Sequence, residues 1–184
     1  MNIVEEARKF VEEECKKPTS KYGFQPYENH FVPMHAYARD LAERKCADLE
    51  IVELAAWLHD IGSIIYGREN HHITGAEVAE KKLRELNYPE DKIAKVKLCI
   101  LTHRGSQNMK KESVEAQIIA DADAMSNFDN LPGIFMAAFV FEHQDQKTAR
   151  NTTRQKLENC WNKLSSEAKE IVKQKYEAAM LLLR

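Results

Sequence analysis

Histidines recur on the apolar faces of the helices that the sequence predicts. In each case an imidazole belongs to a series of apolar residues three, four or seven positions apart, so its ring is expected to point toward the core. The series are Val52, Ala55, Ala56 and His59; Ile93, Val96, Ile100 and His103; His30, Met34, Tyr37, Ala38 and Leu41; and His72, Ala76, Ala79, Leu83 and Leu86. One buried histidine is more often a hydrogen-bonded core residue than a ligand, but several together are costly to desolvate unless they share a partner. A metal ion meets that need, because neutral imidazole is the commonest metal ligand in proteins.

Asp60 directly follows His59, near the predicted end of a helix and just before Gly62. A carboxylate at this end faces the unfavourable pole of the helix dipole, and apolar residues lie one turn behind it. A cation beside the carboxylate would make this placement favourable. The adjacent pair can offer one nitrogen and one oxygen ligand to a single site, although a His-Asp dipeptide by itself is common.

A second candidate acidic ligand lies in the segment IIADADAMSNF. Asp121 and Asp123 are two residues apart, about 200° around a helix, so both cannot face the same site. Both faces are apolar, and periodicity does not choose between them. We expect one of the two to be a metal ligand and the other to be a helix cap, a residue that supports the ligands, or a surface residue.

Four segments resemble the HD superfamily of metal-dependent phosphohydrolases. In order they are HFVPMHAYARDLAERKCADLEIVELAAWLHDIG, HHITGAEVAEKKL, ILTHRG and IIADADAM, and the resemblance covers roughly residues 27–130. Their order and spacing make it far more specific than a lone His-Asp pair. The resemblance implies a small, stand-alone helical domain of the HDIG type that hydrolyses phosphate esters, with His59 and Asp60 as its central catalytic pair.

The resemblance also implies a set of metal ligands. One metal would bind the first histidine of the family pattern, the His-Asp pair and the last aspartate, which match His30, His59, Asp60 and Asp123. A second metal would bind His103 and a histidine that precedes a Gly-Ala helix start, with Asp60 as the bridge. That histidine is His71 by the family spacing and His72 by the apolar series, and both stay candidates.

Imidazole and carboxylate ligands suit Mn, Fe, Co, Ni or Zn, whereas an all-oxygen magnesium site fits poorly. We therefore expect one or two divalent transition metals per chain. His35 lies about 140° around its helix from His30. It is expected to lie at the surface or to support a ligand.

A small phosphate ester or a nucleotide is the expected substrate, because the chain is short and has no added recognition domain. In the basic loop RGSQNMKK, Arg104 and Lys111, together with Lys110, could bind the phosphate, although solvated surface charge would explain the loop equally well. Ser63 stands where the family often has a lysine, and the GYP motif of cyclic-dinucleotide members is absent. Activity on cyclic dinucleotides is therefore not expected.

Two other functions are compatible with the same residues. A few proteins with this ligand set hold two irons and activate dioxygen, so an oxygenase is the first alternative. The second is a non-catalytic helical binding module whose histidines are structural. The metal content and the visible absorption of the purified protein would separate these possibilities.

The composition argues against several classes of partner. The net charge over 184 residues is −2, and no stretch gathers enough Lys and Arg to bind long nucleic acid. No segment approaches the roughly 20 apolar residues that cross a bilayer, and the acidic N-terminal segment does not resemble a signal peptide. The 4 cysteines form no CxxC pair, which is typical of reduced thiols. We expect a cytoplasmic protein with no membrane partner.

The elements that would position these residues are helices. Helical periodicity dominates, and the few Gly and Pro residues mark the breaks, so the sequence predicts an all-α fold. We expect one domain over residues 1–184, with the motif-bearing core at 27–130 and C-terminal helices at 131–184. The predicted helices cover 2–16, 29–45, 48–62, 72–86, 89–103 and 111–128, with a loop at 63–70 and a last helix from 165. This last helix is expected to cap the core, and pairing in a homodimer is the alternative.

Overall fold

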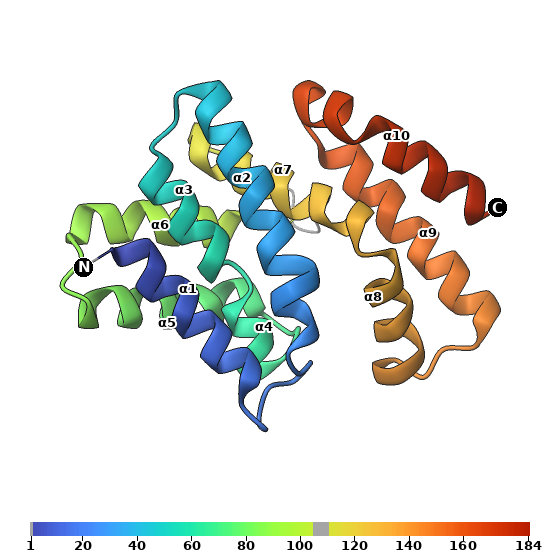
Figure 1. The fold of residues 1–184 in the computed structure, drawn as a ribbon, viewed down its shortest axis with the longest axis horizontal. Helices are drawn as coiled ribbons and strands as arrows, with labels where there is room; N and C mark the ends of the chain where they lie inside the picture. The colour runs from blue at the N-terminus through green and yellow to red at the C-terminus, as the bar shows by residue number, and fades with distance from the viewer. Residues whose placement is uncertain (1, 105–110) are drawn as a thin grey trace.

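The computed structural model describes residues 2–104 and 111–184, and within these ranges the secondary structure is entirely helical. The all-α prediction is therefore confirmed (Figure 1). The elements in chain order are α1 (Ile3–Lys16), η1 (Tyr27–Phe31), α2 (Val32–Lys45), α3 (Leu49–Leu58), α4 (Ile61–Tyr66), α5 (His71–Glu85), α6 (Glu90–Thr102), α7 (Val114–Asp129), α8 (Leu131–Met136), η2 (Ala137–Phe141), α9 (Gln146–Lys163) and α10 (Ser166–Leu182). The elements η1 and η2 are π-helical turns.

Side-chain caps explain where several helices begin. Asp48 accepts a hydrogen bond from the backbone N–H of Ile51, and Ser113 accepts one from Ala116. Comparable caps stand before α1, α9 and α10, at Asn2, Asp145 and Ser165. Each cap pairs a backbone N–H that has no partner inside its own helix, which stabilises the start by about 1 kcal/mol.

The core forms around α3 and α7. Most of α3 is buried, as expected of a helix whose residues are apolar except for Glu50 and Glu53. It packs against α1, α2, α6 and α7, while α5 and α6 lie side by side (Figure 1). This arrangement brings the C-terminal ends of α3 and α6 toward the same region as the start of α5.

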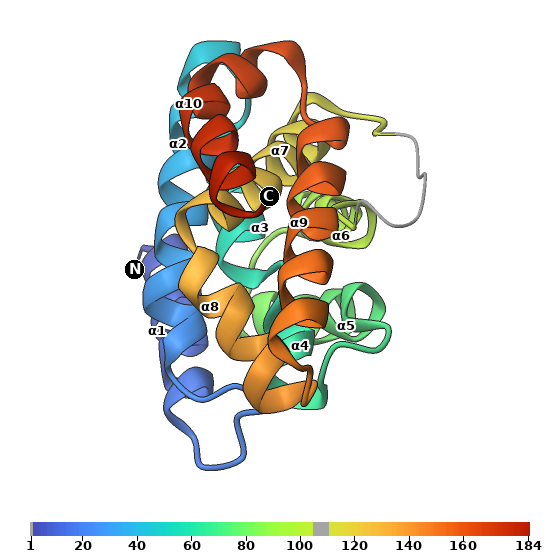
Figure 2. The same ribbon diagram turned by 90° about the vertical axis from the view of Figure 1, so that its right-hand side faces the viewer.

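The C-terminal helices α9 and α10 pack on α7 (Figure 2). Tyr176 of α10 stacks on Trp161 of α9 with ring centroids 4.2 Å apart, and it also meets Phe128 of α7 edge-on. Ala168 and Val172 of α10 are fully buried. The last helix thus covers the core as expected, and pairing with a second copy stays a prediction.

One prediction about local structure was wrong. Residues 63–70 were expected to form a loop after a helix that stops at Gly62, but Ile61–Tyr66 form the short helix α4. Gly62 is needed for close packing and does not end a helix. A Cβ at this position would lie 2.4 Å from the backbone oxygen of His71 and 2.6 Å from the backbone nitrogen of Gly75. The glycine therefore lets α5 approach α4, and this approach positions His71.

Candidate metal centre

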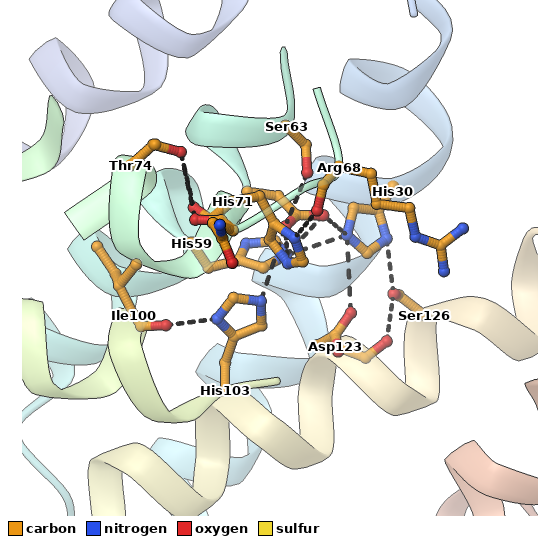
Figure 3. Close-up of polar contacts among 12 residues, drawn as sticks. His30, His59, Ser63, Arg68, His71, Thr74, Ile100, His103, Asp123 and Ser126 are labelled. Carbon is orange, nitrogen blue, oxygen red and sulfur yellow. Dashed lines mark hydrogen bonds and ion pairs between the residues drawn. The ribbon is translucent and has the colours of Figure 1, made fainter. Parts of the chain in front are cut away.

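Three histidines stand at helix ends and are oriented by their own helices. His59 follows the last residue of α3, and its Nδ1 lies 2.9 Å from the backbone oxygen of Ala56. His103 follows α6 and turns its Nδ1 back to Ile100 in the same way, as Figure 3 shows. His71 begins α5, with its Nδ1 2.9 Å from the carbonyl oxygen of Arg68. A carbonyl can only accept, so each Nδ1 carries the proton, and in the neutral imidazole each Nε2 then has a free lone pair.

His30 reaches the same state by a different route. Its Nδ1 lies 3.0 Å from the hydroxyl oxygen of Ser126, and that hydroxyl donates its proton to the backbone oxygen of Asp123 at 2.9 Å (Figure 3). The hydroxyl has only one proton, so the Nδ1 of His30 is the donor in the first contact. The Nε2 of His30 therefore also has a free lone pair. His30 lies in the π-helical turn η1, a local distortion that is frequent at functional sites.

Asp60 lies between two pairs of these imidazoles. Its Oδ2 is 3.6 Å from the Nε2 of His30 and 3.8 Å from that of His59. Its Oδ1 is 3.2 Å from the Nε2 of His71 and 3.7 Å from that of His103. Each carboxylate oxygen thus faces a different pair of nitrogen ligands, which is the arrangement of a bridging carboxylate. Two clusters within the described residues could hold a metal ion, one of His30, His59 and Asp60 and the other of Asp60, His71 and His103.

The distance between two of the donor atoms fits a shared metal ion. The Nε2 atoms of His30 and His59 are 3.0 Å apart, and neither has a proton to donate to the other. Two lone pairs at this distance repel unless a cation lies beside them. Two ligands at about 2.1 Å from one ion would lie roughly 3.0–3.4 Å apart, which agrees with the observed spacing.

The structure distinguishes the two candidate aspartates. The Oδ1 of Asp123 is 3.8 Å from the Nε2 of His30, and its Oδ2 accepts from the ammonium of Lys163 at 3.0 Å. Asp121 points elsewhere: its Oδ1 accepts from the backbone N–H of Ser165, at 2.9 Å, and from the amide of Gln117. Asp123 therefore lies beside the cluster of His30, His59 and Asp60, whereas Asp121 holds the start of α10.

The structure also distinguishes the two candidate histidines of α5. His71 contacts Asp60, whereas His72 belongs to neither cluster. His72 is buried, as its apolar series predicts, and its Nδ1 has no hydrogen-bond partner among the described residues. Burial by itself does not indicate a ligand here, because consecutive residues on a helix point about 100° apart and both can be buried. His35 lies outside the cluster too, bonded to Glu53 at 3.1 Å and stacked on Trp57.

The surroundings hold the ligands in the protonation states that a metal needs. Burial lowers the pKa of His59 to about 4, so its imidazole is neutral at pH 7. Burial acts to raise the pKa of Asp60, but the imidazoles around it, His59 first, outweigh burial and lower this pKa well below its ordinary value. For Asp123 burial is likewise outweighed, chiefly by the charge of Lys163, and the pKa is lowered. Neutral imidazoles and ionised carboxylates are the metal-binding forms.

The sequence model of the HD domain family matches residues 27–127, more than half of the chain and a range that contains the whole cluster. The chain belongs to the HD domain family. HD domains bind divalent metals, and the two His and Asp clusters of this chain could hold such ions.

Solved structures share this fold over nearly the full chain. A protein of Lactobacillus plantarum is 17% identical, with 98% of this chain and 92% of that chain covered and a TM-score of 0.75. YpgQ of Bacillus subtilis, solved in complex with ADP, is 20% identical (97% and 92% covered, TM-score 0.72). An HD-superfamily hydrolase of Bacillus thuringiensis is 21% identical (97% and 91% covered, TM-score 0.71). At these identities the likeness shows the fold alone. No curated protein matched the chain.

One lysine contacts the centre of this HD domain, and two further basic residues influence its electrostatics. Lys163 was not singled out from the sequence, because it lies 40 residues after Asp123 and only the packing of α9 on α7 brings them together. Lys111 is half-buried, and its pKa is lowered by burial first and by the charge of Lys163 second. Arg104 directly follows His103, and its charge contributes to a lowered pKa at His72, where burial is the main cause. Lys110 lies outside the described residues.

Ser63 stands where the family often has a lysine, and it contributes to the centre differently. Its hydroxyl lies 3.5 Å from the Oδ1 of Asp60, at the limit of a hydrogen bond. The position therefore contacts the bridging carboxylate but supplies no positive charge.

No helix of the described chain is long and apolar enough to cross a membrane.

Proposed function

We propose that this HD domain hydrolyses a small phosphate ester or a nucleotide at a centre of one or two divalent transition metals. The ligands would be His30, His59, Asp60, His71, His103 and Asp123, with Asp60 and His59 central to catalysis. One observation supports the proposal most strongly: the two oxygens of Asp60 each face a different pair of unprotonated imidazole nitrogens.

The chain's own residues would prepare this centre. Backbone carbonyls hold three imidazoles in the correct tautomer, and Ser126 does so for His30. Lys163 binds one oxygen of Asp123 and leaves the other turned toward His30. A divalent metal pair supplies an activated water and neutralises charge on a phosphate when it is bound.

A phosphorylated substrate is favoured by the charges around the centre. Lys163 contacts Asp123, and Arg104 directly follows His103 in the sequence. The charge of Lys111 interacts with Asp123 and Asp121. Lysine and arginine side chains of this kind bind phosphate oxygens. YpgQ, which shares the fold, was solved with ADP, and this supports a nucleotide among the possible substrates. The soluble pool of small phosphate compounds in a cytoplasm would supply such a substrate.

Phosphate release from a panel of nucleotides and sugar phosphates tests the proposal. The protein would be stripped of metal and reloaded separately with Mn, Fe, Co, Ni or Zn. We expect activity with at least one metal and its loss in Asp60→Asn, which keeps the size of the side chain. Asp40→Asn serves as the control, because Asp40 is a partly exposed carboxylate that pairs with Arg44 on its own helix. Absence of hydrolysis with every metal, together with a stable visible chromophore in the iron form, would instead favour the oxygenase.

A further inference from the structure

Helix α9 presents a second lysine on the face that already touches the centre. Lys156 and Lys163 are seven residues apart, within about 20° of each other around the helix, so they share a face. Lys163 reaches Asp123 from this face. Both lie outside residues 27–127, the part of the chain that matches the family. In Figure 2, α9 runs along the side of the molecule in front of α6 and α4.

Lys156 lacks the partner that a half-buried ammonium needs. No carboxylate of the described residues comes within ion-pair distance of it, whereas Lys163 is paired with Asp123. Burial lowers the pKa of Lys156, and the charge of Arg68 lowers it further, while Cys160, Asp123 and Asp60 act in the opposite direction. Because Lys163 contacts Asp123 from the same face of α9, Lys156 is directed toward the side of the molecule that carries the acidic ligands. A partly desolvated cation is costly unless an anion joins it.

Arg68 is linked to α9 one turn from Lys156. It pairs with Glu142, which accepts from the amide of Gln144, and Gln144 accepts from the hydroxyl of Thr152, four residues before Lys156. Arg68 follows α4, and its backbone oxygen accepts from His71, so its position is tied to the centre. Its side chain is 61% exposed and meets Glu142 at 3.4 Å. An ion pair this exposed contributes little to stability, so the guanidinium is free to take another anion. Two like charges brought together beside the centre repel each other until an anion binds between them.

We propose that Lys156 and Arg68 form an anion-binding subsite next to the metal centre and that its ligand is a phosphate group of the substrate. The assignment rests on the proposed function, because it gives the substrate of that same site a second point of attachment. A phosphate suits the site better than a carboxylate, since it carries up to two charges and three acceptor oxygens for two cationic groups.

Binding of inorganic pyrophosphate to the metal-free protein tests the subsite without any turnover. Isothermal titration calorimetry would compare the wild type with Lys156→Met, which removes the charge and keeps most of the apolar stem. We expect the affinity to fall about tenfold or more, as for the loss of one charged hydrogen bond. Lys156→Arg should keep most of the affinity, and Arg68→Met should weaken binding less than Lys156→Met because Arg68 is more exposed.

The matched control is Lys147→Met on the same helix. Lys147 is exposed and lies nine residues before Lys156, about 180° around α9, so it makes the same change of charge on the opposite face. The affinity of the Lys147→Met variant for pyrophosphate should equal that of the wild type. Equal affinities for Lys156→Met and Lys147→Met, or no binding by the wild type, would overturn the subsite.

The same variants separate the subsite from the proposed function. If the wild type hydrolyses phosphate esters but Lys156→Met binds pyrophosphate normally, the subsite is wrong and the function stands. If no phosphate ester is hydrolysed but Lys156→Met binds pyrophosphate more weakly than the wild type, the subsite stands and the proposed function is wrong. If both are correct, Lys156→Met raises KM more than it lowers kcat, and its metal content is unchanged.

Discussion

The metal ligands and the lysines of α9 reach the centre in two different ways. His59 and His103 are each oriented by a carbonyl three residues earlier on their own helix, so most of their geometry is local. Lys156 and Lys163 lie on a helix whose local structure says nothing about Asp60 or Asp123, and they arrive only because α9 packs on α7. The ligands are therefore prepared one helix at a time, while the basic side of the site depends on tertiary packing.

The largest effect is expected at the residue shared by both clusters. Asp60→Asn replaces one carboxylate oxygen by an amide that cannot bridge two metals. We expect the metal content to fall and phosphate-ester hydrolysis to drop by more than about a hundredfold, since changes to residues that merely support ligands already cost 10- to 100-fold. Elemental analysis and initial rates would measure both. Full metal content in Asp60→Asn would contradict the bridging role.

The pair His103→Ala and His72→Ala separates a ligand from a merely buried histidine. His103→Ala should lose one metal per chain of the two and most activity, because it removes one nitrogen from the cluster of Asp60 and His71. His72→Ala should keep its metals and lose only stability, by about 1–3 kcal/mol for a buried side chain. Elemental analysis and thermal unfolding of both variants give the comparison. Loss of metal from His72→Ala would show that the apolar series had indicated the ligand after all.

Lys163→Met and Lys156→Met compare the two lysines of α9. Lys163 holds one oxygen of Asp123 at 3.0 Å, so its loss should weaken metal binding by about tenfold or more. Lys156→Met should leave metal affinity unchanged. Competition with a chelator of known affinity measures both constants. Equal effects of the two variants would mean that the lysines share one role.

The smallest effect on the centre is expected for Asp121→Ala. The carboxylate accepts from the backbone N–H of Ser165 where α10 begins, so its loss should lower the free energy of unfolding by about 1–3 kcal/mol. Metal content and activity per folded molecule should match the wild type. Chemical denaturation and elemental analysis check the two halves of this prediction, and a loss of metal would place Asp121 among the ligands.

Much of the local structure follows from the sequence by itself. Asp48 and Ser113 cap helices because a short oxygen-bearing side chain pairs a free N–H at a helix start. The apolar series correctly predicts that His59, His72 and His103 are buried. The order of the His and Asp motifs indicated the HD family, which the family match confirms. Helix α4 was missed because Gly62 resembles a helix stop, and nothing local reveals that α5 packs against it.

What the tertiary structure alone decided is which buried groups meet. His71 and His72 are adjacent and both buried, and Asp121 and Asp123 lie two residues apart on one helix. Periodicity gives the direction of each side chain around its own helix, but it does not give the distance to a side chain on another helix. The contact of Asp60 with His71 and the reach of Lys163 to Asp123 depend on how α5 and α9 dock. The sequence by itself determined most of the helices, their buried faces and the family. The packing of those helices determined the six side chains that converge and placed Lys163 beside them.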